Sequence, residues 1–217
     1  MIGGDRQLER IRAGEVRELA GLRVAIDVQH LYRPDRPRDH GATVRLANGT
    51  TITEAELATG YAGHAAGELE ARGALVLRND PARGLLVGHY SSRARAASSW
   101  GARVYLACHV NAGGGDYARA YGVGSRGVQL ARDIVLELDR VSRLIDEGQA
   151  LELRPGERGW VCIAGAVAPT LGILLEPFFL DTPGHRGLVS AAGLGVVGRA
   201  IGRSVGAWWL RQPVPTA

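Results

Sequence analysis

Lysine is absent from this 217-residue sequence, so all 26 basic residues are arginine. Cysteine is almost as scarce, with only Cys108 and Cys162. Two cysteines are too few for a four-cysteine zinc site, and they cannot supply a disulfide framework for a chain of this length. Because each lies in an apolar stretch, we expect two buried, reduced thiols, as in a protein made in a reducing cytoplasm.

Long hydrophobic runs are missing as well. No stretch approaches about 18 consecutive apolar residues, so we expect no membrane insertion. The first ten residues are polar and include acids, unlike the apolar core of a signal peptide. We therefore expect cytoplasmic synthesis without a signal peptide. The length suits one domain over residues 1–217, with its core at about 22–210, and we expect a monomer.

The charge balance is basic, with a net charge of +4 and an isoelectric point near 9.5. Such a balance favours an anionic partner, for example an acidic polymer or a nucleic acid. The arginines are spread along the chain, however, and no basic block is interleaved with aromatic residues. We therefore expect no nucleic-acid binding.

The hydrophobic pattern alternates between short apolar runs and segments with helical spacing. This alternation predicts an α/β domain with a single open, mostly parallel or mixed sheet and helices on both faces. The predicted strands cover residues 23–28, 74–77, 103–108 and 171–175, and the predicted helices cover 1–20, 53–73, 91–100, 125–141 and 187–209. Residues 31–50, rich in proline, glycine and charge, are predicted to be a loop.

The best-defined helix start is at Thr53. Thr53 and Glu56 have the spacing of a capping box, in which each side chain accepts a hydrogen bond from the other's backbone N–H. Apolar residues then recur every four positions and mark the buried face of the helix. The sequence at Ser125 predicts a second capped helix start.

Three predicted strands end in a polar group that a buried strand does not require. His30, His109 and Glu176 each follow an apolar run. Because ligands of open α/β sheets bind beyond the carboxyl ends of the strands, these side chains are candidates for one site. Two histidines and a carboxylate are a typical ligand set for catalytic zinc, which leaves one coordination position for water.

Glu54 is the candidate for a further carboxylate. It is the first residue of the helix that Thr53 caps, and it shares the inward face with Leu57. Its alternative role is purely structural, since an acidic residue near a helix N-terminus is stabilised by the helix dipole. Glu56 is already explained by the capping box.

Four elements together give the chain a family resemblance. They occur in the order Asp27-Val-Gln-His30; Glu54 through Leu69-Glu-Ala-Arg-Gly73; Ser92-Arg93 and Tyr105-Leu-Ala-Cys-His-Val-Asn111; and Leu174-Leu-Glu-Pro-Phe-Phe179. In this order and spacing, over about residues 22–210, the chain resembles the zinc-dependent N-acetylmuramoyl-L-alanine amidases of the amidase-3 type. The resemblance implies a phosphorylase/hydrolase-like fold.

The chain also departs from the family pattern. Gln29 stands where the family usually has glycine, and Cys108 stands at a position that is typically isoleucine-like. The first element is the weakest match, so His40, in the same loop as His30, is the alternative ligand. Gly41 and Ala42 match the Gly-Ala that the family has later in this loop.

The resemblance implies a role for each candidate residue. His30, Glu54 and His109 would hold one Zn²⁺ per chain, and Glu176 would be the catalytic base. Arg93 and Asn111 would support the site. The implied substrate is peptidoglycan, and the implied reaction is hydrolysis of the amide between N-acetylmuramic acid and L-alanine, which degrades the cell wall.

The resemblance leaves the biological setting and some alternatives open. With no room for a separate wall-binding domain, we expect either a phage endolysin, released at host lysis, or a sporulation enzyme. One alternative is a zinc carboxypeptidase-like amide hydrolase. A second is a catalytically inactive wall-binding protein of the same fold, which the Gln29 departure favours. A nucleic-acid-binding protein is a third, supported by charge alone.

Overall fold

The computed structural model describes residues 18–46, 48–142 and 148–212. Nearly all of the helix expected at residues 1–20 lies outside these ranges, and residues 18–21 form a turn. No helix in the described ranges is both long and apolar enough to cross a membrane.

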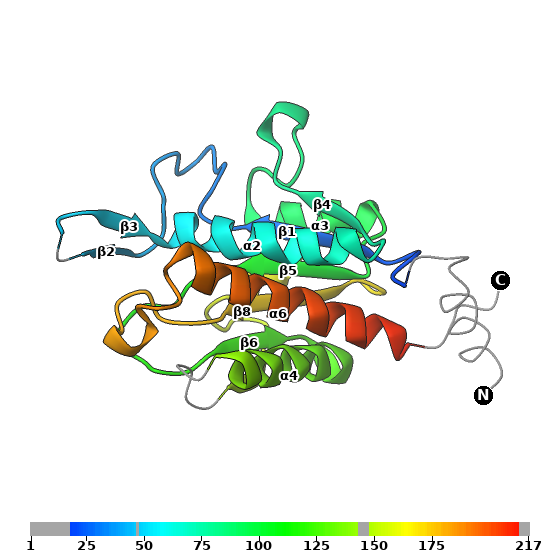
Figure 1. Ribbon diagram of the computed structural model, residues 1–217. Coiled ribbons are helices and arrows are strands. Elements are labelled where there is room, and N and C mark those ends of the chain that lie inside the picture. Colours follow the sequence, from blue (N-terminus) through cyan, green and yellow to red (C-terminus); the bar gives the residue numbers. More distant parts are fainter. Residues whose placement is uncertain (1–17, 47, 143–147, 213–217) are drawn as a thin grey trace.

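A six-stranded mixed sheet forms the centre of the molecule (Figure 1), which confirms the predicted α/β class. The strand order is β4-β1-β5-β8-β6-β7. Neighbours pair in parallel except β6 and β8, which are antiparallel. The strands are β1 (Arg23–Val28), β4 (Leu75–Arg78), β5 (Val104–Cys108), β6 (Arg119–Gly122), β7 (Gln149–Glu152) and β8 (Leu171–Glu176).

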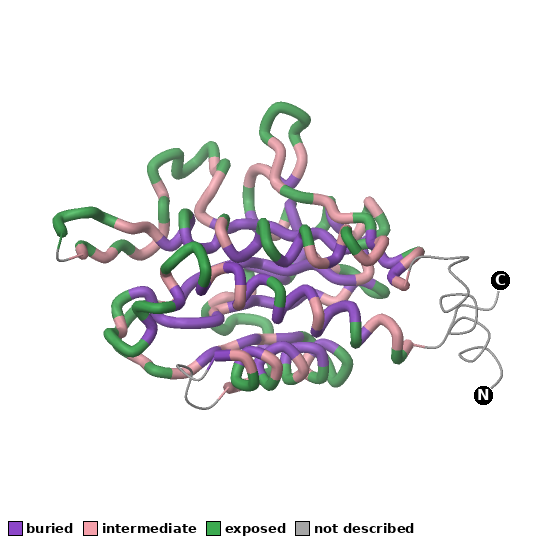
Figure 2. Tube along the Cα trace, viewed as in Figure 1, coloured by how far each residue is buried: buried purple, intermediate pink, exposed green. Residues whose placement is uncertain are grey.

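Helices cover both faces of this sheet. They are α2 (Glu54–Ala71), α3 (Tyr90–Ser99), α4 (Gly124–Val141), α5 (Trp160–Ile163) and α6 (Ala191–Leu210). Side chains alternate along β1: Val24 and Ile26 pack in the cluster that includes α2, α4 and α6, whereas Ala25 packs in the cluster that includes α3 and α5. Figure 2 shows that burial is greatest in the central strands and on the sheet-facing sides of the helices.

Helix α2 begins as predicted and fixes the first residue of the site. The Thr53 hydroxyl accepts the Glu56 N–H at 3.2 Å, and the Glu56 carboxylate accepts the Thr53 N–H at 2.8 Å. Helix α2 packs closely on α6 around Tyr61. A Cβ atom at Gly198 of α6 would lie 2.2 Å from the Tyr61 carbonyl oxygen. Glycine at 198 therefore lets the two backbones approach.

Several features differ from the sequence expectations. Strands β6 and β7 were not expected, because their sequences, Arg-Ala-Tyr-Gly and Gln-Ala-Leu-Glu, form no apolar run. Part of the expected 31–50 loop forms a hairpin of β2 (Thr43–Arg45) and β3 (Thr51–Thr53) around the turn near Gly49. The predicted Ser125 cap is wrong: Val123 is the N-cap of α4 and makes no side-chain cap bond, since β6 leads directly into the helix.

Candidate metal centre

Three predicted ligands meet at the carboxyl-terminal edge of the sheet. His30 lies two residues after β1, and His109 follows β5 directly. These strands are parallel neighbours with Val28 opposite Cys108, so both histidines emerge at the same edge. Glu54, the first residue of α2, points its carboxylate between them.

The ligand atoms of these three residues lie close together. His109 Nδ1 is 2.8 Å from Glu54 Oε1 and 3.2 Å from His30 Nε2, and His30 Nε2 is 3.4 Å from Glu54 Oε1. Glu54 and His109 are only 6% and 8% exposed. The structure therefore brings these three side chains together in one group.

The donor set fits a metal ion. A tetrahedral ion bonded at about 2.0–2.1 Å separates its ligand atoms by roughly 3.3 Å, close to the separations here. Two imidazole nitrogens and one carboxylate oxygen, each within 4.8 Å of the others, supply three ligands and leave a fourth position for water or substrate. The residues therefore form a group that could bind a metal.

Hydrogen bonds from residues outside this group orient His30 and Glu54. His30 Nδ1 lies 2.9 Å from Asp39 Oδ1, and Glu54 accepts backbone N–H groups from Ala42 at 2.9 Å and Val110 at 3.1 Å. Partners of this kind fix ligand orientation at metal sites. Sequence reasoning missed Asp39, which lies in an irregular loop and whose proximity depends on how that loop folds back.

Gly41 allows the loop to close over Glu54. Its φ angle is +72°, and a Cβ atom at this position would lie 2.4 Å from Glu54 Oε2. A larger residue would displace the carboxylate, so the Gly41-Ala42 pair noted in the sequence has a direct role in shaping the site.

Interactions within this group of side chains shift the pKa values of Glu54 and His30. Burial opposes ionisation of Glu54, but hydrogen bonds and charge interactions with His109 and His30 hold the pKa of this carboxyl well below its usual range. Burial likewise opposes the charged form of His30, yet Glu54 and Asp39 raise the pKa of this imidazole above its ordinary value. The carboxylate thus remains ionised and attracts a cation.

Glu176, the predicted base, is the last residue of β8 at the same edge. Burial raises the pKa of its carboxyl, with the nearby Glu54 charge adding to the increase and His109 opposing it. Arg119 lies directly opposite on β6 and also opposes the rise. A carboxyl with a raised pKa is suited to exchanging a proton during a reaction.

The two predicted support residues, Arg93 and Asn111, make different kinds of contact. Arg93 is fully buried and pairs with Asp27 at 3.0 Å, and its guanidinium also donates to the Gly88 carbonyl. The Asn111 side chain instead accepts the N–H of Ala112, and its backbone bridges to Phe179. Arg93 therefore anchors Asp27, which we call the floor of the site because it lies buried behind the three clustered residues. Asn111 instead shapes the neighbouring loop.

The other histidines and the cysteines lie outside the ligand group. His40, the alternative ligand, is exposed and is not among the three clustered residues. His185 is buried and its Nδ1 accepts the Phe179 N–H at 2.9 Å. Cys108 and Cys162 are buried free thiols, as expected.

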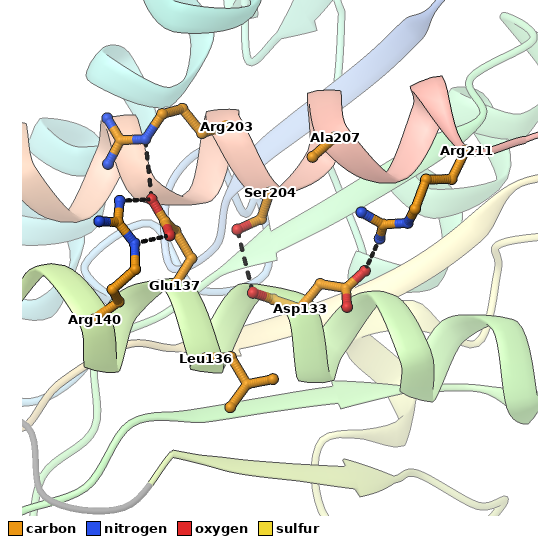
Figure 3. Close-up of a pocket in the computed structure, with 8 residues that line it drawn as sticks. All are labelled: Asp133, Leu136, Glu137, Arg140, Arg203, Ser204, Ala207 and Arg211. Atoms are coloured by element: carbon orange, nitrogen blue, oxygen red, sulfur yellow. Dashed lines mark hydrogen bonds and ion pairs between the residues drawn. The ribbon is translucent and has the colours of Figure 1, made fainter.

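A second gathering of charges lies between α4 and α6 (Figure 3). This groove of about 430 Å³ is lined by Asp133, Leu136, Glu137, Arg140, Arg203, Ser204, Ala207 and Arg211. Arg140 and Arg203 both bind the Glu137 carboxylate, and Arg211 binds Asp133. These matched ion pairs tie the two helices together and present no set of free ligand atoms.

Comparisons with known proteins address the fold. The sequence matches no family model, and no curated protein matches it significantly. Among solved structures, Cwp6 from Clostridium difficile has a TM-score of 0.68 at 20% identity, covering 86% of this chain and 29% of Cwp6. The chain thus spans less than a third of that protein.

Two further structures match over nearly their whole length. The catalytic domain of CwlV, an N-acetylmuramoyl-L-alanine amidase from Bacillus (Paenibacillus) polymyxa, has a TM-score of 0.67 at 17% identity, covering 86% of this chain and 97% of that one. The catalytic domain of the CD27L endolysin, which targets C. difficile, has a TM-score of 0.57 at 15% identity, covering 85% and 96%. The chain therefore has the fold of these catalytic domains.

Proposed function

We propose that this protein is a zinc-dependent N-acetylmuramoyl-L-alanine amidase that degrades peptidoglycan. The observation that carries the proposal is that His30, Glu54 and His109 lie together at one edge of the sheet. Strand β8 ends at the same edge, with Glu176 as its last residue. The shared fold with the catalytic domain of CwlV, itself named as such an amidase, supports the choice of reaction.

His30 Nε2, Glu54 Oε1 and His109 Nδ1 would hold the metal. A zinc ion held there would supply the chemistry of such sites, in which the pKa of a bound water is lowered to about 7 and a carbonyl is polarised. Glu176 accepts the proton of the attacking water and then donates it to the departing amine of L-alanine. Its raised pKa suits both halves of this transfer, since the carboxyl must gain and lose the proton within one cycle.

The proposal extends to domain organisation and setting. Residues 1–217 would form a single catalytic domain with its core at about 22–210, because the described helices pack on both faces of one sheet. The match to an endolysin catalytic domain supports a role in lysing bacterial cell walls.

The test is digestion of purified peptidoglycan followed by analysis of the newly freed ends. We expect new N-terminal L-alanine, lost on treatment with a chelator and restored by zinc. Release of a carboxyl-terminal residue instead would indicate a carboxypeptidase-like hydrolase. Binding to walls without any new ends, in protein loaded with zinc, would indicate an inactive wall-binding protein and refute the proposal.

A further inference from the structure

Gln29 is a fully buried polar residue directly beneath the metal ligands, at a position where the resembling amidases usually have glycine. Its Oε1 lies 3.0 Å from His109 Nε2. Its Nε2 lies 3.2 Å from Asp27 Oδ2 and 3.3 Å from the Cys162 carbonyl oxygen. The amide therefore connects the floor of the site to one ligand.

The partners of Gln29 fix which way its amide points. A carboxylate and a carbonyl oxygen can only accept hydrogen bonds, so the NH₂ group must face Asp27 and Cys162. Tyr105 donates its hydroxyl proton to Asp27 at 2.5 Å and is left to accept from the same NH₂ group at 3.2 Å. The carbonyl oxygen of Gln29 consequently faces His109.

This orientation determines where His109 carries its proton. A carbonyl oxygen accepts only, so His109 Nε2 must be the protonated nitrogen. Nδ1 then faces Glu54 Oε1 at 2.8 Å, and because an ionised carboxylate also only accepts, Nδ1 can present a lone pair there only when a cation lies between the two atoms. A histidine can bind a metal only through an unprotonated nitrogen, and its other nitrogen normally donates to such an acceptor.

We propose that Gln29 is a positioning residue that holds His109 in the tautomer required for metal binding. The amide is itself held in place, because Arg93 and Asn79 both donate to the Asp27 carboxylate that Gln29 contacts. His109 thus donates to Gln29 and Gln29 donates to Asp27, which also accepts from Arg93. This inference rests on the proposed metal centre for its purpose, although the proton on His109 Nε2 can be measured without metal.

The primary test is long-range ¹H–¹⁵N NMR of the full-length protein, both metal-free and loaded with zinc. We expect His109 Nε2 to carry a proton in both forms, and Nδ1 to be unprotonated in the zinc-loaded form. An unprotonated Nε2 in the wild-type protein would overturn the inference. This readout needs no variant, so it remains decisive even if a substitution at position 29 prevents folding.

The second test compares two variants by competition for zinc with a chromophoric chelator. Gln29→Met keeps the side-chain length but removes the acceptor, and we expect its zinc affinity to fall about 10–100-fold. Cys162→Ala is the matched control, because it removes the other neighbour of His109 Nε2, a sulfur 3.7 Å away, and leaves the Gln29 carbonyl in place. We expect Cys162→Ala to bind zinc like the wild type.

The outcomes separate this inference from the proposed function. Unchanged zinc affinity and tautomer in Gln29→Met, or an equal loss in Cys162→Ala, would overturn the role of Gln29 while leaving the metal centre intact. Wild-type protein that binds no zinc would refute the metal centre, and the tautomer measurement would still decide whether Gln29 orients His109.

Discussion

The two places where charged and polar side chains gather differ in how their charges are matched. In the groove between α4 and α6, Glu137 accepts from two arginines, at 2.7 Å from Arg140 and 3.0 Å from Arg203. At the sheet edge, Glu54 instead faces two imidazole nitrogens, and no arginine pairs with it among the described residues. Ion pairs that already neutralise each other need no ligand. A buried carboxylate that faces two imidazole nitrogens is instead stabilised by a bound cation.

The largest difference between the sheet edge and the groove is expected in turnover, when a glutamate in each is replaced by glutamine. Glu176→Gln removes the proposed base and should lower turnover by about 10²–10⁴-fold while zinc binding persists. Glu137→Gln, the matched control in the groove, should leave turnover unchanged. Rates of wall digestion and zinc content measure both effects. Near-normal turnover in Glu176→Gln would show that the base is another group.

The next contrast concerns ion pairs in the two regions. Arg93→Met leaves the fully buried Asp27 carboxylate without its cation and should destabilise the fold by about 3–5 kcal/mol. Arg140→Met, at a solvent-exposed arginine, should cost far less, because exposed ion pairs contribute little to stability. Denaturant unfolding measures both values. Equal costs would mean that the floor of the site is no more tightly coupled to the fold than the groove is.

A smaller effect is expected on the pH dependence of the reaction. Glu176 must be ionised to act as a base, so turnover falls as pH drops through its raised pKa. The Arg119 cation favours the ionised form, and Arg119→Gln should therefore move this acidic limit to higher pH. The pH profile of turnover in zinc-saturated protein is the measurement. A shift to lower pH would contradict the assignment of the limit to Glu176.

The smallest effect is expected in the groove itself. Glu137→Gln weakens two exposed or half-exposed ion pairs between α4 and α6 and should lower the free energy of unfolding by about 0.2–1 kcal/mol. Thermal unfolding at low and high salt tests this, since screening should reduce the difference. A loss well above this range would mean that the groove contributes to the fold more than its exposure suggests.

The three clustered residues are marked in the sequence by local patterns. His30 and His109 each end an apolar strand, and Glu54 follows a clear helix cap. Parallel pairing of β1 and β5 then brings the two histidines to one edge, which is a general property of such sheets. Element type therefore predicted that His30 and His109 share one edge, whereas the choice of Glu54 as their partner came from the family resemblance.

The partners of those ligands were not predictable in the same way. Asp39 lies in a loop without periodicity, and Gln29 was noticed only as a departure from a family pattern. Their roles depend on side-chain directions that only the folded chain defines. The short strands β6 and β7 were missed because, unlike the equally short β4, they form no apolar run that separates a strand from a loop.

The central claim is that the cluster at the sheet edge is a metal site while the groove is not. Calorimetric titration of zinc into chelator-treated protein tests it most directly. We predict about one zinc bound per wild-type chain, none for Glu54→Gln, and one again for Glu137→Gln. A wild-type protein that takes up no zinc, or a Glu54→Gln variant that binds it as tightly, would contradict the claim.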